Sequence, residues 1–380
     1  VQGKEIMNKL GIYIHIHFCE RRCKYCDFTS SIFNQDRMKD YVDHLLLEIK
    51  NNEELLKNYI VDTIFIGGGT PSLLSVEDLR RLVNGLNEAI NLDENYEFTI
   101  ETNPNSISEE KLLAYRKLGI NRISIGVQSF NDRLLRIIGR LHTADEAHEK
   151  IKLAKKYFDN LSLDFIFSLP TETLSDVIES IDTASELGAS HISLYSLILE
   201  EGTLLNALVE RGVYRVNDQV TDRLIYRKAT HHLESLGYKQ YEISNFAKDG
   251  CFSRHNYKYW SMDEYLGLGM AAHSLIENKR FFNASTFNEY FGDVKKNIYH
   301  DEEILSREDK ITEYIIFKLR TNEGIIIDEI NKKYDINFED IYKEELSKAA
   351  DEKLLKKCDG RYFYTELGRD LANQVEILFV

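Results

Sequence analysis

From residue 11 to about residue 197, short runs rich in β-branched and aromatic residues alternate with longer amphipathic segments. The expected strands are residues 12–17, 63–66, 97–102, 122–126, 162–167 and 191–197. Apolar residues recur at helical spacing in the segments between them, as in Leu79, Leu82, Val83 and Leu86. This alternation predicts a parallel sheet with right-handed crossovers. The expected fold class is α/β, a partial (βα)6 barrel, since six such units close most of a barrel.

The rest of the chain divides into a tail and two further segments. Residues 1–10 are expected to form an N-terminal tail, residues 11–240 the barrel, and residues 241–300 a connecting segment dominated by loops up to residue 273. Residues 301–380 show helices, a hairpin at residues 359–364 and a final helix, which resembles a small winged-helix module. This module carries 13 basic and 20 acidic residues, so it is not expected to bind DNA.

Composition excludes several classes of protein. The chain has 380 residues, of which 43% are hydrophobic and 29% charged, as in a globular protein. No apolar run approaches the ~18 residues of a membrane span and no signal-peptide pattern is present, so a cytoplasmic protein without an integral membrane segment is expected. A net charge of −15 argues against nucleic acid as a partner. Cys251 and Cys358 stand alone and are expected to be ordinary packing or surface residues.

Three cysteines, Cys19, Cys23 and Cys26, lie within eight residues directly after the first expected strand. A structural zinc site needs four ligands, and His15 or His17 could supply the fourth only if the loop folded back tightly. Three thiolates can instead hold a [4Fe–4S] cluster and leave one iron without a protein ligand. The spacing therefore favours a cluster over a zinc ion.

Unusual residues follow the ends of the later strands, where parallel sheets place their binding sites. The three prolines of the chain all occur there, and residues 67–72 read Gly-Gly-Gly-Thr-Pro-Ser. Missing side chains let a ligand approach the backbone, although this stretch lacks the pattern of a phosphate loop. Polar candidates at other strand ends are Glu101, Gln128, Arg140 and Asp164. A carboxylate at such a position suits ribose hydroxyls.

The C-x3-C-x2-C spacing after the strand Tyr13-Ile14-His15-Ile16 resembles the radical S-adenosylmethionine (radical SAM) superfamily. In that superfamily the open iron of a [4Fe–4S] cluster binds SAM, which is then cleaved reductively. The resemblance implies that Cys19, Cys23 and Cys26 are the cluster ligands. The SAM-binding positions it implies are Tyr13, Gly68, Gly69, Thr70, Glu101, Gln128, Arg140 and Asp164.

The order of the motifs resembles the oxygen-independent coproporphyrinogen III oxidase-like family. These motifs are the cysteines, the H-N-x-x-Y-W sequence at residues 255–260 and the C-terminal module. Within that family they are similar to the haem chaperone HemW branch. Phe28 stands where the dehydrogenase branch has a further cysteine, and the cysteines come soon after the start of the sequence. Two departures are His17 in place of a usual proline, and Ser-Leu-Pro-Thr-Glu-Thr at residues 168–173 in place of Gly-Leu-Pro-Gly-Gln-Thr.

This resemblance implies a [4Fe–4S] and SAM protein that binds haem as cargo and delivers it to haem-acceptor proteins, with a homodimer left open. Three alternatives remain: an oxygen-independent coproporphyrinogen III dehydrogenase, a radical SAM methylase or cyclase, and a zinc-dependent interaction module. Whether the chain is an enzyme also stays open, because the cluster could cleave SAM, while coproporphyrinogen dehydrogenase activity is not expected.

His255 is the candidate axial ligand of haem, since an imidazole commonly ligates haem iron and neighbouring aromatic rings can pack on the macrocycle. Cys251 and His273 are secondary candidates. An alternative role for His255 is to brace the junction between the barrel and the C-terminal module.

Overall fold

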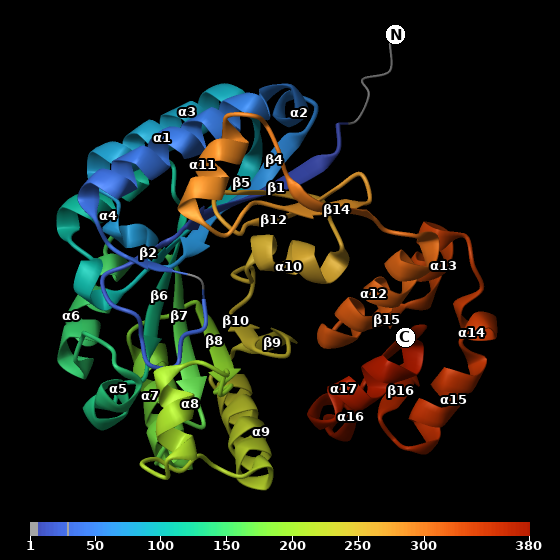
Figure 1. Cartoon of the computed structure of the whole chain (residues 1–380). Coiled ribbons are helices and arrows are strands. Elements are labelled where there is room, and N and C mark those ends of the chain that lie inside the picture. The colour runs from blue at the N-terminus through green and yellow to red at the C-terminus, as the bar shows by residue number, and fades with distance from the viewer. Residues whose placement is uncertain (1–6, 29) are drawn as a thin grey trace.

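The computed structural model describes residues 7–28 and 30–380, and its largest feature is a 12-stranded sheet (Figure 1). Six central strands run parallel and in chain order, as the sequence predicts. They are β1 (Lys9–Ile16), β4 (Ile60–Gly68), β5 (Asn91–Thr102), β6 (Arg122–Gln128), β7 (Asn160–Phe167) and β8 (His191–Ser196). The α/β fold class with a partial (βα)6 barrel is therefore confirmed.

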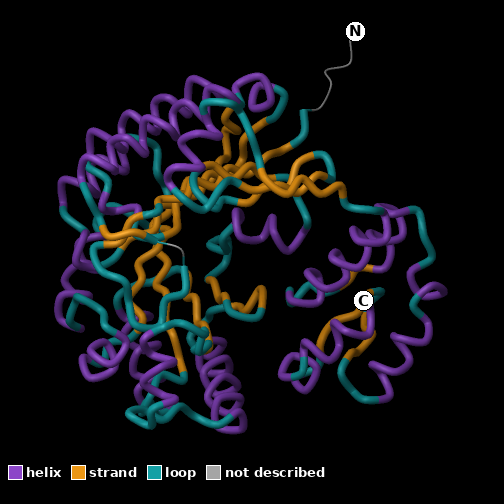
Figure 2. The backbone as a smooth tube through the Cα atoms, viewed as in Figure 1, coloured by secondary structure: helices purple, strands orange, loops and turns teal. Residues whose placement is uncertain are grey.

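Helices cover the outer side of this sheet (Figure 2). They are α1 (Gln35–Asn51), α2 (Glu53–Lys57), α3 (Val76–Ala89), α4 (Glu109–Lys117), α5 (Asp132–Ile138), α6 (Ala144–Lys155), α7 (Leu174–Glu186), α8 (Leu204–Glu210) and α9 (Gln219–Ser235). In α3 the Ser75 hydroxyl accepts the Asp78 N–H and caps the helix, and the predicted face with Leu79 and Leu82 is buried. The main hydrophobic core lies between the sheet and the helices other than α5 and α8, which pack together in a smaller cluster.

The other face of the six strands is polar and buried. Cross-strand pairs Thr63↔Glu97, Thr99↔Arg122, Ser124↔Ser162 and Ser162↔His191 place these side chains next to one another. Side chains alternate across a strand, so the residues between these positions, such as Ile12 and Ile64, face the helices. The barrel interior below the strand ends is therefore filled by buried polar side chains.

The connecting segment is not dominated by loops, contrary to expectation. It adds β9 (Lys239–Glu242) and β10 (Asn245–Ala247) beside β8, and β11 (Tyr265–Leu268), β12 (His273–Ile276), β13 (Lys279–Phe282) and β14 (His300–Ile304) beside β1. It also holds α10 (Arg254–Ser261), which carries the H-N-x-x-Y-W sequence, and α11 (Phe287–Val294). The strands have three to five residues, too few for a clear period-2 pattern.

The expected segment bounds stay a prediction, with two observed differences at their edges. β1 begins at Lys9, inside the expected tail, and β9 crosses the bound expected at residue 240. Residues 1–6 of that tail lie outside the described residues.

The C-terminal module has its own hydrophobic core and a three-stranded sheet in the order β15-β17-β16. Its elements are α12 (Arg307–Arg320), β15 (Ile325–Ile326), α13 (Ile327–Tyr334), α14 (Phe338–Ile341), α15 (Lys343–Asp351), β16 (Leu355–Cys358), β17 (Arg361–Tyr364), α16 (Glu366–Asp370) and α17 (Ala372–Glu376). The hairpin is the β16–β17 pair, and the predicted residues 359–364 cover its turn and second strand but not its first strand. Across the described residues, no helix combines the length and apolarity needed to cross a membrane.

Candidate functional site: a cavity at the strand ends

The loop that carries the three cysteines is closed at its base by the short parallel pair β2 (Phe18–Cys19) and β3 (Ser31–Ile32). The Ser31 N–H donates to the His17 carbonyl at 2.8 Å, so His17 lies at the loop entrance. The Lys24 N–H donates to the Ile138 carbonyl at 3.0 Å, which holds the middle of the loop against the end of α5. The sequence therefore folds the cysteines over the carboxyl ends of the strands.

A cavity of about 490 Å³ opens between this loop and the strand ends. This volume is within the usual range for small-molecule sites. The predicted site residues that line it are Cys19, Cys23, Cys26, Gly68, Gly69, Thr70, Glu101, Gln128, Arg140 and Asp164. Residues from six segments of the chain thus meet at one cavity.

Hydrogen-bond donors lie beside two of the three sulfur atoms. Thr70 Oγ1 is 3.7 Å from Cys19 Sγ, and Arg140 Nη1 is 3.6 Å from Cys23 Sγ. Asn103 joins these donors: its Nδ2 donates to Thr70 Oγ1 at 3.1 Å, and its Oδ1 accepts from Arg140 Nη2 at 2.6 Å. Donors of this kind favour the thiolate form that ligates iron. Sequence reasoning missed Asn103, whose only signal is its place two residues after Glu101.

Two further observations test whether the cavity fits a cluster and SAM. Within the described chain, Arg140 Nε is buried without a hydrogen-bond partner, so a cation is available beside Cys23. No three His, Cys, Asp or Glu side chains of the described residues already converge as a metal-ion site. The donors and the cation fit a ligated sulfur and a bound carboxylate, while the cluster itself stays a proposal.

The glycine stretch is shaped by close backbone approach. Gly68 has φ +109°, and a Cβ on Gly69 would lie 2.5 Å from the Phe18 carbonyl oxygen. The Gly68 N–H donates to Glu101 Oε2 at 3.1 Å. A side chain at position 68 would strain the backbone, and one at position 69 would push the cysteine loop away, so both positions require glycine.

Two carboxyl groups face this cavity from β5 and β7, the strands on either side of β6. Burial and the nearby Asp164 raise the pKa of Glu101 to about 8. Burial also raises the pKa of Asp164, against the opposing effect of hydroxyls that donate to it. Each group would gain from hydrogen-bond donors on a ligand, as a ribose diol offers.

Tyr13 and His255 do not line the cavity. The Tyr13 hydroxyl lies 2.9 Å from His15 Nδ1, deeper in the barrel. His255 is fully buried, with Nδ1 2.9 Å from Thr63 Oγ1 and Nε2 2.9 Å from the Tyr259 hydroxyl. Both ring nitrogens are thus engaged by the protein.

Helix α10 lies between the base of the barrel and the C-terminal module. Its first N–H groups, those of Arg254 and His255, donate to the Glu97 carboxylate at 3.0 and 3.1 Å. On its other side the Tyr257 hydroxyl donates to Glu323 Oε2 of the module at 2.7 Å. This arrangement is the one that a bracing role of His255 requires. The secondary candidates Cys251 and His273 do not line the cavity.

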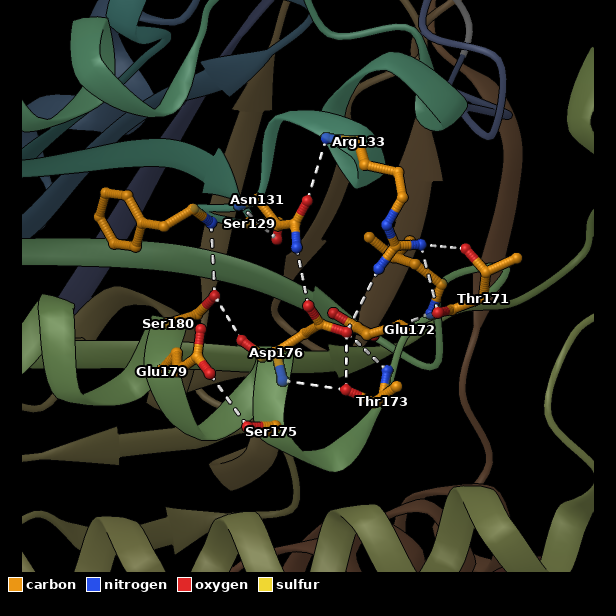
Figure 3. A network of polar contacts seen from close by, with 12 residues as sticks. Ser129, Asn131, Arg133, Thr171, Glu172, Thr173, Ser175, Asp176, Glu179 and Ser180 are labelled. Carbon is orange, nitrogen blue, oxygen red and sulfur yellow. Dashed lines mark hydrogen bonds and ion pairs between the residues drawn. The ribbon is translucent and has the colours of Figure 1, made fainter.

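The loop at residues 168–173, whose sequence differs from the family pattern, is held by a polar network (Figure 3). Ser168 and Thr171 take φ values of +61° and +68°, in the left-handed region that glycine prefers. Arg133 Nη1 donates to the Thr171 carbonyl at 3.2 Å, and its Nη2 lies 3.3 Å from Asp176 Oδ2. The Leu169 N–H donates to Glu172 Oε2 at 2.9 Å, while burial raises the pKa of Glu172 to about 8. The network thus fixes two strained positions.

We expect Ser168→Gly to raise the free energy of unfolding by about 1 kcal/mol, because glycine relieves the left-handed backbone and removes a buried hydroxyl. That hydroxyl has no hydrogen-bond partner among the described residues. Urea unfolding followed by circular dichroism measures the change. Thr171→Gly is the matched control: it relieves the same φ but loses the bond to Arg133, so it should gain less. Equal or lower stability of Ser168→Gly would contradict the prediction.

Comparisons with known proteins agree with this architecture. The radical SAM superfamily matches residues 13–184, and the HemN C-terminal domain matches residues 305–371. Curated proteins named Heme chaperone HemW from Lactococcus lactis and Escherichia coli are 34% and 32% identical to the chain. These alignments cover 96% and 98% of the chain, and 95% and 98% of the two relatives.

A solved structure described as coproporphyrinogen III oxidase (HemN) from Escherichia coli, a radical SAM enzyme, has a TM-score of 0.85 with 23% identity. It covers 98% of the chain, and the match spans 90% of that protein. At this identity the likeness shows a shared fold.

Proposed function

The chain belongs to the haem chaperone HemW family of the radical SAM superfamily, and from this premise we propose that it holds a [4Fe–4S] cluster and SAM at the strand ends and carries haem to acceptor proteins. The single observation that carries the cofactor part is the shared cavity of the three cysteines and seven predicted rim residues. The names of the relatives support the haem part.

The residues of the chain have distinct roles in this proposal. Cys19, Cys23 and Cys26 would hold the cluster, and Thr70 and Arg140 would donate to their sulfur atoms. When bound, the cluster supplies an open iron for SAM and the electron that SAM cleavage requires. The guanidinium of Arg140 would face the SAM carboxylate.

The other rim residues would hold the rest of SAM. Gly68 and Gly69 would let its amino group approach the backbone, and Glu101 and Asp164 would accept hydrogen bonds from ribose. Gln128 and Tyr13 would complete the pocket, with Tyr13 acting from below through its contact with His15. The cysteine loop would exclude water above the ligand.

His255 as the axial ligand of haem also stays a prediction. Coordination by His255 would require one of its bonds, to Thr63 or to Tyr259, to break. Haem titration of wild type and His255→Ala, followed at the Soret band, measures the contribution of this imidazole. Equal affinity and an identical spectrum would refute His255 as the ligand and leave it as a brace. The cytoplasmic location and the homodimer likewise remain predictions.

Anaerobic reconstitution tests the proposal as a whole. We expect iron and sulfide in the ratio of a [4Fe–4S] cluster, haem binding, and haem transfer to an apo-haem protein that gains its own Soret spectrum. Incubation with coproporphyrinogen III, SAM and a reductant should yield no protoporphyrinogen. Protoporphyrinogen at enzymatic rates would favour the dehydrogenase, and transfer of a labelled SAM methyl group would favour a methylase. Zinc in place of iron would refute the cluster.

We expect Glu101→Gln to weaken SAM binding by about 1–3 kcal/mol at a pH above the raised pKa of Glu101, because the change then removes a charged acceptor and keeps the shape. Calorimetry on reconstituted protein measures this affinity. Glu110→Gln, on the exposed surface of α4, is a matched control and should leave the affinity unchanged. Unchanged affinity of Glu101→Gln would remove Glu101 from the site.

A further inference from the structure

A chain of hydrogen bonds runs through the barrel interior and ends on Asp164. The Ser253 N–H lies 3.3 Å from the Tyr241 hydroxyl, which lies 2.8 Å from His191 Nε2. His191 Nδ1 lies 2.8 Å from Ser162 Oγ, and Ser162 Oγ lies 3.2 Å from Asp164 Oδ1. Neither the predicted site nor the family-derived roles use His191 or Ser162.

Each link of this chain has a definite donor. Ser162 has a single hydroxyl proton, which it donates to Asp164, so His191 Nδ1–H must donate to Ser162 Oγ. A neutral imidazole then accepts at Nε2, and the Tyr241 hydroxyl donates to it. Burial and the nearby Arg122 keep the pKa of His191 well below its usual value, which is consistent with a neutral ring. All donors therefore point toward the carboxylate.

The chain is buried and structurally fixed. His191 is 1% exposed, and Ser162 and Ser253 are fully buried. Ser253 caps α10, the helix of the H-N-x-x-Y-W sequence, and the Tyr241 carbonyl accepts the Asn322 N–H of the C-terminal module at 3.0 Å. The chain thus begins where the barrel meets the module.

Asp164 accepts from three hydroxyls. Ser162 and Ser193 donate to Oδ1, at 3.2 and 2.8 Å, and Ser124 lies 3.1 Å from Oδ1 and 2.8 Å from Oδ2. These bonds leave Oδ2 with one protein donor while Asp164 lines the cavity. A carboxylate has about four acceptor sites, so Oδ2 can still accept a ligand hydroxyl.

We propose that His191 is a positioning residue for SAM: through Ser162, and supported by Tyr241, it fixes the Asp164 carboxylate that accepts from the ligand. This inference rests on the proposed function, because it assumes that SAM occupies the cavity. His191 itself touches neither SAM nor the cluster. Its loss would free the Ser162 hydroxyl to turn away, and the buried carboxylate would lose a donor.

The sign of the pH dependence follows from this loss. A hydroxyl donor favours the ionised carboxyl, so its loss raises the pKa of Asp164 further. SAM binding is strengthened by the ionised carboxylate, so as the pH falls the variant would weaken its hold on SAM at a higher pH than wild type. The other titratable or charged groups that face Asp164 are Glu101, Arg122, His191 and Tyr195. Since Glu101 also titrates, the test compares variants in a common background.

The experiment measures the affinity of anaerobically reconstituted protein for SAM by calorimetry across a pH series. We expect His191→Phe to weaken binding about threefold to tenfold near neutral pH and to move the acidic loss of binding to higher pH. His191→Asn should rescue most of the affinity, because its amide can donate in place of Nδ1. Tyr238→Phe is the matched control, since this buried hydroxyl donates to the Ala189 carbonyl at 2.7 Å outside the chain of bonds.

A second series of variants, made in Asp164→Asn protein, shows whether the pH shift acts through Asp164. In Asp164→Asn protein, His191→Phe should add no further pH shift, because the titrating carboxyl is gone. A shift that persists there would overturn the inference, as would equal affinity and pH profile of His191→Phe and wild type. If His191→Phe does not fold, the pH profiles of Tyr241→Phe and His191→Asn decide in its place. Wild-type protein that binds no SAM would instead refute the proposed function.

Discussion

Protein in which Cys19, Cys23 and Cys26 are all replaced by Ala should hold no iron–sulfur cluster after anaerobic reconstitution. The physical reason is that thiolates are the ligands that bind such clusters, and these three are the cysteines that line the cavity. The brown colour and the iron–sulfur absorbance should be lost, together with bound iron and sulfide. Absorbance spectra with iron and sulfide analysis provide the measurement.

The matched control changes the other two cysteines. Cys251 and Cys358 are also free thiols, but they do not line the cavity, so the double Ala variant should reconstitute like wild type. Full iron and sulfide content in the triple variant would overturn the assignment. Loss of the cluster in the Cys251 and Cys358 variant would show that ligands from outside the loop take part.

The central strands were predictable because each carries a short run of β-branched, aromatic or leucine residues between two amphipathic segments. The edge strands were not, because their pairing is decided by tertiary contacts rather than by local pattern. β11 pairs in parallel with β1, more than 240 residues earlier in the chain, and Gly267 is required there because a Cβ would meet the His273 carbonyl oxygen at 2.1 Å. No periodicity in residues 265–268 indicates such a contact.

The rim of the site was predictable for a related reason. Side chains at the carboxyl ends of parallel strands meet at one edge of a sheet, so Glu101, Gln128 and Asp164 could be grouped without coordinates. Arg140 follows α5, and the family resemblance is what placed it with them. His191 and Ser162 could not, since their roles depend on cross-strand register and on which face of the strand they occupy. Both ring nitrogens of His255 are engaged by the packing of α10.

The largest loss of stability is expected for Asp62→Ala, by about 3 kcal/mol in the free energy of unfolding, because it leaves a buried ammonium without its counter-ion. Asp62 and Lys258 are each 6% exposed, and Lys258 Nζ lies 2.9 Å from Asp62 Oδ1. Asp62 occupies a register shift of β4, which turns its side chain toward α10 in place of the regular alternation. Denaturant unfolding followed by circular dichroism measures the loss.

Two controls show whether the loss comes from the unpaired charge. Adding Lys258→Met to Asp62→Ala removes that charge and fills the space, so the double variant should regain much of the stability. Glu53→Ala breaks the exposed pair with Lys57 and should cost far less stability than Asp62→Ala. A double variant no more stable than Asp62→Ala would show that Asp62 acts by other means.

Because the pair lies at the barrel base and the cysteines lie at the strand ends, Asp62→Ala protein that still folds should retain its cluster. Loss of the cluster would show that α10 also supports the rim.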